Sequence, residues 1–103
     1  MVELRVTEQE RAGVTTLILG GELDAQSSPR LAELLTPAVA VPQANVQIDL
    51  TDVGYIDSTG LGVLVAALKQ ATDKSGSLEL VRPSESVARL LHVTGLDKVF
   101  VIH

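Results

Sequence analysis

Short apolar segments with a two-residue repeat alternate along this chain with segments whose apolar residues recur at helical spacing. Strict alternation predicts half-buried strands, whereas spacings of three and four residues predict helices that bury one face. The expected strands lie at residues 2–6, 14–19, 46–50, 78–80 and 99–102. Strands separated by helices pair most readily in parallel, with right-handed crossovers, and this restricts the chain to a few α/β architectures.

Local signals place the three expected helices. Ser28, as N-cap, and Pro29, at the first helical position, predict the start of the first helix, whereas Pro37 predicts a kink or a restart near Thr36. The second helix is expected to run from about Asp57 to Lys74, and the third from about Ser84 to Thr94, with Gly95 as its stop. The expected core residues of the first two helices are Leu31, Leu34, Leu35, Ala38, Val39, Leu61, Leu64, Val65 and Leu68.

The fold class follows from this order. A fully parallel, doubly covered sheet has strands that are continuously apolar, but polar residues interrupt three of these strands: Glu3, Arg5, Gln47, Asp49 and Glu79. We therefore predict a small mixed sheet with helices mostly on one face and the order ββαβαβαβ. The 103 residues, of which 46% are hydrophobic, suffice for one domain, expected to span residues 1–103.

Charge and composition exclude several function classes. The net charge is −5, the eight basic residues are scattered and the aromatic residues are 2% of the chain, so a nucleic-acid partner is not expected. With no cysteine and two histidines, we expect no metal and no cofactor. No apolar run reaches the roughly 18 residues of a membrane span, and no secretion signal precedes the first strand. A cytoplasmic location is the expectation.

The most informative segment joins the third strand to the second helix. Asp57, Ser58 and Thr59 are all N-cap residue types, although one helix start needs only one. A hydroxyl at this positive end is easily presented to solvent, and a phosphate on it is compatible with the helix dipole. Gly60 and Gly62 remove side-chain bulk nearby. Capping and packing explain the same residues without any function, so the residues alone leave both interpretations open.

Other chemistries fit the residues less well. A Ser–His–carboxylate hydrolase is disfavoured because Ser58 lacks the G-x-S-x-G context, and His92 is expected on a solvated helix face with Glu85 and Arg89. Gly60-Leu61-Gly62 is too short a motif to indicate a phosphate-binding loop. Asp24 and Asp57 are expected to cap helices rather than bind a metal, and Asp24 is also expected to lie at the rim near Ser58. Arg82 is expected to be a solvated strand end.

Residues 48–62 read IDLTDVGYIDSTGLG, which resembles the signature of the STAS domain in its anti-sigma factor antagonist branch. Similar matches follow in the family's order, with GGELD at residues 20–24, LVRPS at 80–84 and TGLD at 94–97. The resemblance covers nearly the whole chain. It implies a protein switch rather than an enzyme, in which Ser58 accepts phosphate.

In this family the unmodified protein binds an anti-sigma factor that is itself a serine kinase, and thereby frees a sigma factor. Phosphorylation separates the complex, and a serine phosphatase resets it. The residues expected to contact the partner are Asp24, Asp57, Ser58, Thr59, Gly60, Leu61, Gly62 and Val63. Similar domains also serve as accessory subunits of ABC-type lipid transporters or of stress-signalling assemblies, which is the alternative function.

Overall fold

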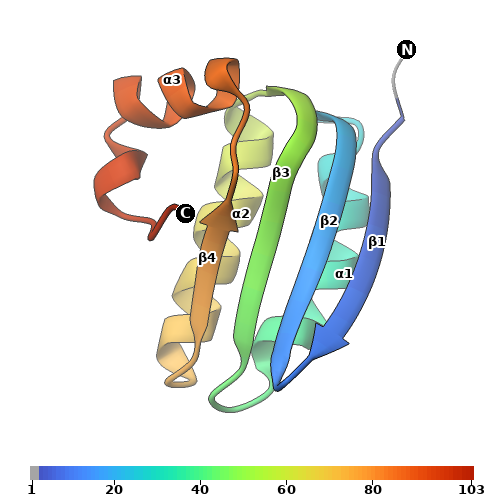
Figure 1. Cartoon of the computed structure of the whole chain (residues 1–103), viewed down its shortest axis with the longest axis vertical. Helices are drawn as coiled ribbons and strands as arrows, with labels where there is room; N and C mark the ends of the chain where they lie inside the picture. The colour runs from blue at the N-terminus through green and yellow to red at the C-terminus, as the bar shows by residue number, and fades with distance from the viewer. Residues whose placement is uncertain (1–2) are drawn as a thin grey trace.

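One mixed four-stranded sheet organises the chain, and two helices cover one of its faces (Figure 1). The computed structural model describes residues 3–103. Its elements are β1 (Arg5–Arg11), β2 (Val14–Leu23), α1 (Ser28–Ala40), β3 (Asn45–Ile56), α2 (Ser58–Asp73), β4 (Ser77–Val81), α3 (Glu85–Val93) and a 3₁₀ helix (Leu96–Lys98). The sheet order is β1-β2-β3-β4, with β1 and β2 antiparallel and the other pairs parallel. The expected fold class is confirmed.

The core lies between the sheet and the pair α1 and α2. Leu17, Ile48 and Leu80, which come from three neighbouring strands, are fully buried. The helices add a second layer of buried side chains: Leu31, Leu35 and Val39 from α1, and Leu61, Leu64, Ala67 and Ala71 from α2. The apolar side chains that alternate along the strands therefore pack against those that recur at helical spacing on α1 and α2, and together they form one core.

Several strands are longer than their sequence patterns indicate. The strand expected at residues 2–6 is found at 5–11; Val2 lies outside the described residues. β2 continues through Gly20 and Gly21 to Leu23, and β3 continues to Ile56. The pairing of β2 with β3 is irregular in this extension, with register shifts near Gly20 and Glu22. β2 therefore extends beyond the expected residues 14–19 through both glycines, which pair with β3 and are buried.

The terminal strand expected at residues 99–102 is wrong. The 3₁₀ helix ends at Lys98, and the amides of Val99 and Phe100 both donate to the Leu96 carbonyl in the turn that follows it. The last three residues do reach β4. Ile102 forms an isolated parallel bridge with Leu80, the Val101 carbonyl accepts from the Leu80 amide, and the amide and carbonyl of His103 bond to Leu80 and Arg82. Phe100 is buried, so this stretch contributes to the core as well as to the short pairing with β4.

The helix boundaries agree with the sequence signals with one shift. Ser27, not Ser28, is the N-cap of α1, because the amides of Arg30 and Leu31 both donate to its carbonyl. The helix does not restart at Pro37, since Pro37 and Glu33 are both exposed and water can reach the carbonyl that lacks a donor. In α2, Val65 is 36% exposed, which corrects its place in the expected core.

The helix-free face of the sheet holds a buried charge. Asp49 is only 7% exposed, and its carboxylate accepts hydrogen bonds from Thr51 and from the Arg82 guanidinium, the latter at 2.7 Å. Burial opposes ionisation of this carboxyl, but the hydrogen bonds from Thr51 and Arg82 outweigh it and hold the pKa of Asp49 below its usual value. Arg82 is therefore not simply a solvated strand end, because it neutralises Asp49.

Between residues 3 and 103 no helix combines the length and the apolar character needed to cross a bilayer.

Candidate functional site

Asp57 forms the N-cap of α2 and fixes the geometry of the site. Its backbone is extended, its carbonyl accepts from the Leu61 amide at 3.0 Å, and its Oδ1 accepts from the Gly60 amide at 2.9 Å. A side-chain acceptor at this position satisfies an otherwise unpaired donor of the first turn. The expected capping role of Asp57 is confirmed, and the helix needs no second capping side chain.

Ser58 is the first residue of α2, and its side chain is exposed. Within residues 3–103 its hydroxyl makes no hydrogen bond, and neither does the exposed hydroxyl of Thr59. Both hydroxyls lie at the positive end of the helix dipole. Position 58 can therefore accept a negatively charged group without losing any contact inside the protein.

The loop between β2 and α1 lies against this turn. The second carboxylate oxygen of Asp57 accepts from the Ala25 amide at 3.1 Å, and the Asp57 amide donates to the Leu23 carbonyl at 3.1 Å. One residue thus joins two strand-to-helix turns. Both turns lie at the same end of the sheet, because Leu23 and Ile56 are partners at the ends of two parallel strands.

Asp24 organises its own loop. Its Oδ1 accepts from the amides of Gln26 and Ser27, each at 3.0 Å, and from the Ser27 hydroxyl at 3.1 Å. These bonds, chiefly the one from the Ser27 amide, hold the pKa of the Asp24 carboxyl below its usual value. Asp24 closes the turn before α1 rather than capping the helix. Across residues 3–103, no group of three or more His, Cys, Asp and Glu side chains is placed to hold a metal ion.

A shallow groove of about 490 Å³ runs between α1 and α2, and Thr59, the neighbour of Ser58, lines it. Its walls are mostly apolar and small: Thr59, Gly62, Val63, Ala66 and Ala67 from α2, with Ala32, Leu35 and Thr36 from α1. Gly62 is exposed, and a Cβ placed there would meet no atom within 4 Å. The groove therefore offers close backbone approach to another molecule next to Ser58.

Gly60 and Leu61, expected at the contact surface, are buried. A Cβ on Gly60 would come within 2.6 Å of the Leu23 carbonyl oxygen, so the absence of a side chain lets α2 sit against the end of β2. These two residues support the site from inside. The residues of the expected partner surface that face solvent are Ser58, Thr59 and Gly62, with Asp24, Asp57 and Val63 half-buried.

The structure adds residues that the sequence analysis did not single out. Ala25 contributes only a backbone amide, and Ala32 and Thr36 reach the groove from another helix. The only sequence signal near them was the GGELD segment before the loop. Backbone donors and small groove residues have no characteristic spacing, so only the tertiary structure reveals them.

The two histidines pair with carboxylates away from Ser58. His92 Nδ1 lies 2.9 Å from Asp97, and the hydrogen bond between them lowers the pKa of the Asp97 carboxyl. His103 Nε2 lies 2.6 Å from Glu79. Glu85 and Arg89 form the expected exposed pair on α3, at 3.5 Å. Neither imidazole serves Ser58 as a base in this arrangement.

Comparison with known proteins places this geometry in a family. The anti-sigma-B factor antagonist of Bacillus subtilis is 44% identical over 84 residues, covering 82% of this chain and 76% of that protein. The protein of the same name from Staphylococcus epidermidis is 40% identical over 85 residues, covering 82% and 79%.

A crystal structure of an anti-sigma factor antagonist from Mycobacterium paratuberculosis superposes with a TM-score of 0.87 at 29% identity, covering 98% of this chain and 86% of that one. The model of the STAS domain family matches residues 5–103. With the capped serine turn, the mixed sheet and these matches in agreement, the chain belongs to the STAS domain family.

Proposed function

We propose that this protein is an anti-sigma factor antagonist whose binding is switched off by phosphorylation of Ser58. In its unmodified form it binds an anti-sigma factor serine kinase and thereby releases a sigma factor. The single observation that supports the proposal most directly is the division of roles at the start of α2, where Asp57 caps the helix and Ser58 presents its hydroxyl to solvent. The similarity to proteins named anti-sigma-B factor antagonists supports the same conclusion.

The partner surface in this proposal has two parts. One is the turn that carries the exposed hydroxyls of Ser58 and Thr59, called the hydroxyl turn below, and the other is the groove between α1 and α2. Ser58 and Thr59 form one end of this surface, and Gly62 and Val63 continue it along α2. Asp24 and Asp57 position the loop beside it. The protein acts as a binding module and a kinase substrate, without catalysis of its own, and functions in the cytoplasm with a separate serine phosphatase.

The switch follows from electrostatics and desolvation. Phosphorylation adds about −1.5 to −2 charges at pH 7 to a chain whose net charge is already −5. The helix dipole stabilises that charge in the free protein. In the complex the hydrated dianion would have to enter a close contact beside small apolar residues, and burying an unpaired charge is costly. A penalty of about 3 kcal/mol lowers the affinity more than a hundredfold.

The proposal is tested by phosphorylation with the cognate anti-sigma kinase and Mg²⁺–ATP, followed by native mass spectrometry. We expect one phosphate on the wild type, one on Thr59→Ala and none on Ser58→Ala. Thr59→Ala is the matched control, because it removes the adjacent exposed hydroxyl. Phosphorylation of Ser58→Ala at the wild-type level would disprove the assignment of the site, and equal kinase binding by the modified and unmodified proteins would disprove the switch.

A further inference from the structure

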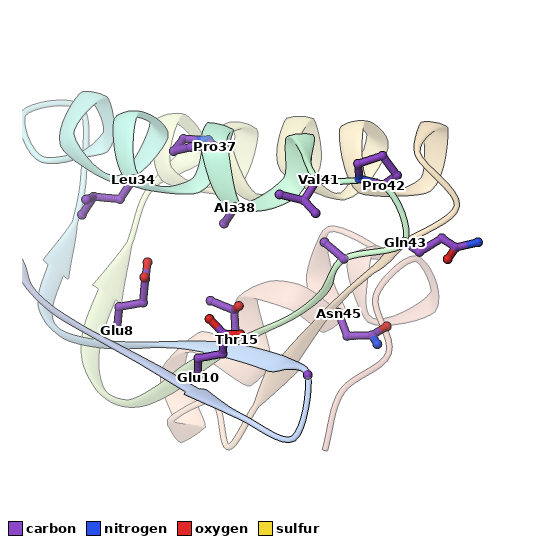
Figure 2. A pocket seen from close by; sticks show the side chains of 12 residues that line it. Glu8, Glu10, Thr15, Leu34, Pro37, Ala38, Val41, Pro42, Gln43 and Asn45 are labelled. Atoms are coloured by element: carbon purple, nitrogen blue, oxygen red, sulfur yellow. The ribbon is translucent and has the colours of Figure 1, made fainter.

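A second groove lies at the other side of α1, between that helix and the edge strand β1 (Figure 2). Its volume is about 450 Å³. Glu8 and Glu10 point from β1 toward the helix, and Leu34, Ala38 and Val41 face them (Figure 2). One wall is therefore acidic and the opposite wall is apolar.

The negative charge of this groove favours a positively charged occupant. Among residues 3–103, none of those that line it is basic. Glu8 and Glu10 are exposed, and within residues 3–103 neither forms an ion pair. The last turn of α1 carries no basic residue, so the negative end of the helix dipole adds to the two carboxylates. A lysine or arginine side chain fits both walls, because its aliphatic stem packs on apolar surface while its charged end stays near the carboxylates.

β1 also presents an open edge next to the groove. It pairs only with β2 among the described strands, and nearly all of its residues are exposed. An exposed edge offers its backbone donors and acceptors to an added strand. Alternate residues of such a strand would face α1, on the same side as Glu8 and Glu10.

A second copy of this chain is disfavoured at that edge in the register centred on Glu8. An antiparallel pair centred on Glu8 would place Glu8 opposite Glu8 of the other copy, and Arg5 opposite Arg11. Like charges directly opposite each other destabilise a strand pair. In that register the charges of β1 oppose self-association, whereas Glu8 and Glu10 favour a segment of opposite sign on the helix side.

We propose that the α1–β1 groove, lined by Glu8, Glu10, Leu34, Ala38 and Val41, is a docking site for an extended basic segment of another protein. The segment adds to the β1 edge and directs lysine or arginine side chains at alternate positions into the groove. Glu10 and its β2 partner Thr15 lie where β2 and β3 begin, whereas Ser58 follows the end of β3. The site is therefore distinct from the hydroxyl turn and goes beyond the proposed function.

The test uses a seven-residue peptide of alternating lysine and threonine, titrated into the isotopically labelled protein and followed by amide chemical shifts. We expect saturable shifts confined to β1 and the second half of α1, with a Kd below about 1 mM. Glu8→Gln/Glu10→Gln should weaken binding by about fivefold to tenfold, because it removes two charge interactions. A peptide with glutamate in place of lysine should not bind.

The matched control is Asp52→Asn/Asp73→Asn, which removes two exposed carboxylates elsewhere and gives the same net charge. It should bind the lysine peptide with wild-type affinity. Equal weakening by both double variants would show general charge attraction and overturn the proposal, as would equal affinity of wild type and Glu8→Gln/Glu10→Gln. A concentration-dependent dimer whose shifts map to β1 would make a second copy the occupant and also overturn it. None of these outcomes depends on phosphorylation of Ser58.

Discussion

Both carboxylate oxygens of Asp57 accept hydrogen bonds, so the side chains of Ser58 and Thr59 are not needed to cap the helix. One oxygen accepts from the first turn of α2, and the other accepts from the Ala25 amide of the preceding loop. Substituting a capping residue by alanine typically costs about 1 kcal/mol of stability. At the residue scale the site is therefore built from one structural carboxylate and two exposed hydroxyls, those of Ser58 and Thr59.

The two glycines of the same turn should respond oppositely to alanine. A Cβ on Gly60 would lie 2.6 Å from the Leu23 carbonyl oxygen, so Gly60→Ala should lower the free energy of unfolding by about 1–3 kcal/mol. Gly62 has open space around it, so Gly62→Ala should raise that free energy by about 0.5–1 kcal/mol through helix propensity. Urea unfolding followed by circular dichroism measures both.

Each glycine variant is the control for the other, since the two substitutions are identical and lie two residues apart in one helix. If Gly60→Ala is as stable as Gly62→Ala, the close packing of α2 on the end of β2 is disproved. In the proposed function Gly62→Ala should also weaken binding of the anti-sigma kinase, because the new methyl group projects into the open surface beside the groove.

Individual residues of the site were only partly predictable. The run of three cap-type residues located the turn, but their chemistry does not say which of them caps, since Asp57, Ser58 and Thr59 are all competent. Small size suggested that Gly60 and Gly62 belong to one exposed patch, yet one is buried and the other exposed. That difference depends on where β2 ends, which is a tertiary property.

At the scale of elements, the Arg82–Asp49 pair ties the end of β4 to the middle of β3. The guanidinium and the carboxylate are 2.7 Å apart, and Arg82 has a φ of 50°. A positive φ is uncommon for a residue other than glycine, and it raises the conformational energy of the backbone at that residue. The pair holds the chain in place as it leaves the sheet toward α3.

The pair should make stability depend on pH in the acid range. Because the folded-state pKa of Asp49 is below its unfolded value of about 3.9, its contribution is complete above that value and is lost as the pH falls through the folded pKa. Between pH 6 and pH 2.5, Asp49→Asn should therefore lose less free energy of unfolding than the wild type. Urea titrations at a series of pH values test this.

Arg82→Gln serves as the control from the other partner, and should show part of the same flattening of the pH dependence. Parallel pH profiles of the wild type and Asp49→Asn would contradict the stabilisation of ionised Asp49 by its hydrogen bonds.

Element types were more predictable than element ends. The helical spacing and caps of α2 and α3 located both helices, because side-chain chemistry at a helix terminus is local. Strand ends depend on partners: β2 continues through two glycines because β1 and β3 pair with it. Val99–Ile102 has a strand composition, but Val99 and Phe100 form a turn after the 3₁₀ helix, and the pairing with β4 is limited to a single bridge at Ile102.

At the scale of the whole molecule, both helices that cover the sheet lie on one face, and α2 begins at the end of the sheet opposite the β1–β2 turn (Figure 1). The hydroxyl turn and the α1–β1 groove therefore lie at opposite ends of the strands. A partner on Ser58 and a basic segment on β1 would occupy separate surfaces, so the two proposals can be tested independently.

The fold as a whole should tolerate negative charge at position 58. Ser58→Glu should keep the circular dichroism of the wild type and raise the free energy of unfolding by about 0.3–1 kcal/mol, because an acidic side chain at a helix start interacts favourably with the dipole. Ser58→Gln, similar in size but neutral, is the control and should lack that gain. Unfolding of Ser58→Glu at lower urea than Ser58→Gln would contradict the electrostatic basis of the switch.

Because Asp57 supplies the helix cap, replacement of the neighbouring serine removes no hydrogen bond found within residues 3–103. Under the proposed function, selection at position 58 then acts on the binding of other proteins rather than on folding. Under the proposed function, one nucleotide change at this codon abolishes the response to the kinase and a second restores it, while the protein stays folded throughout.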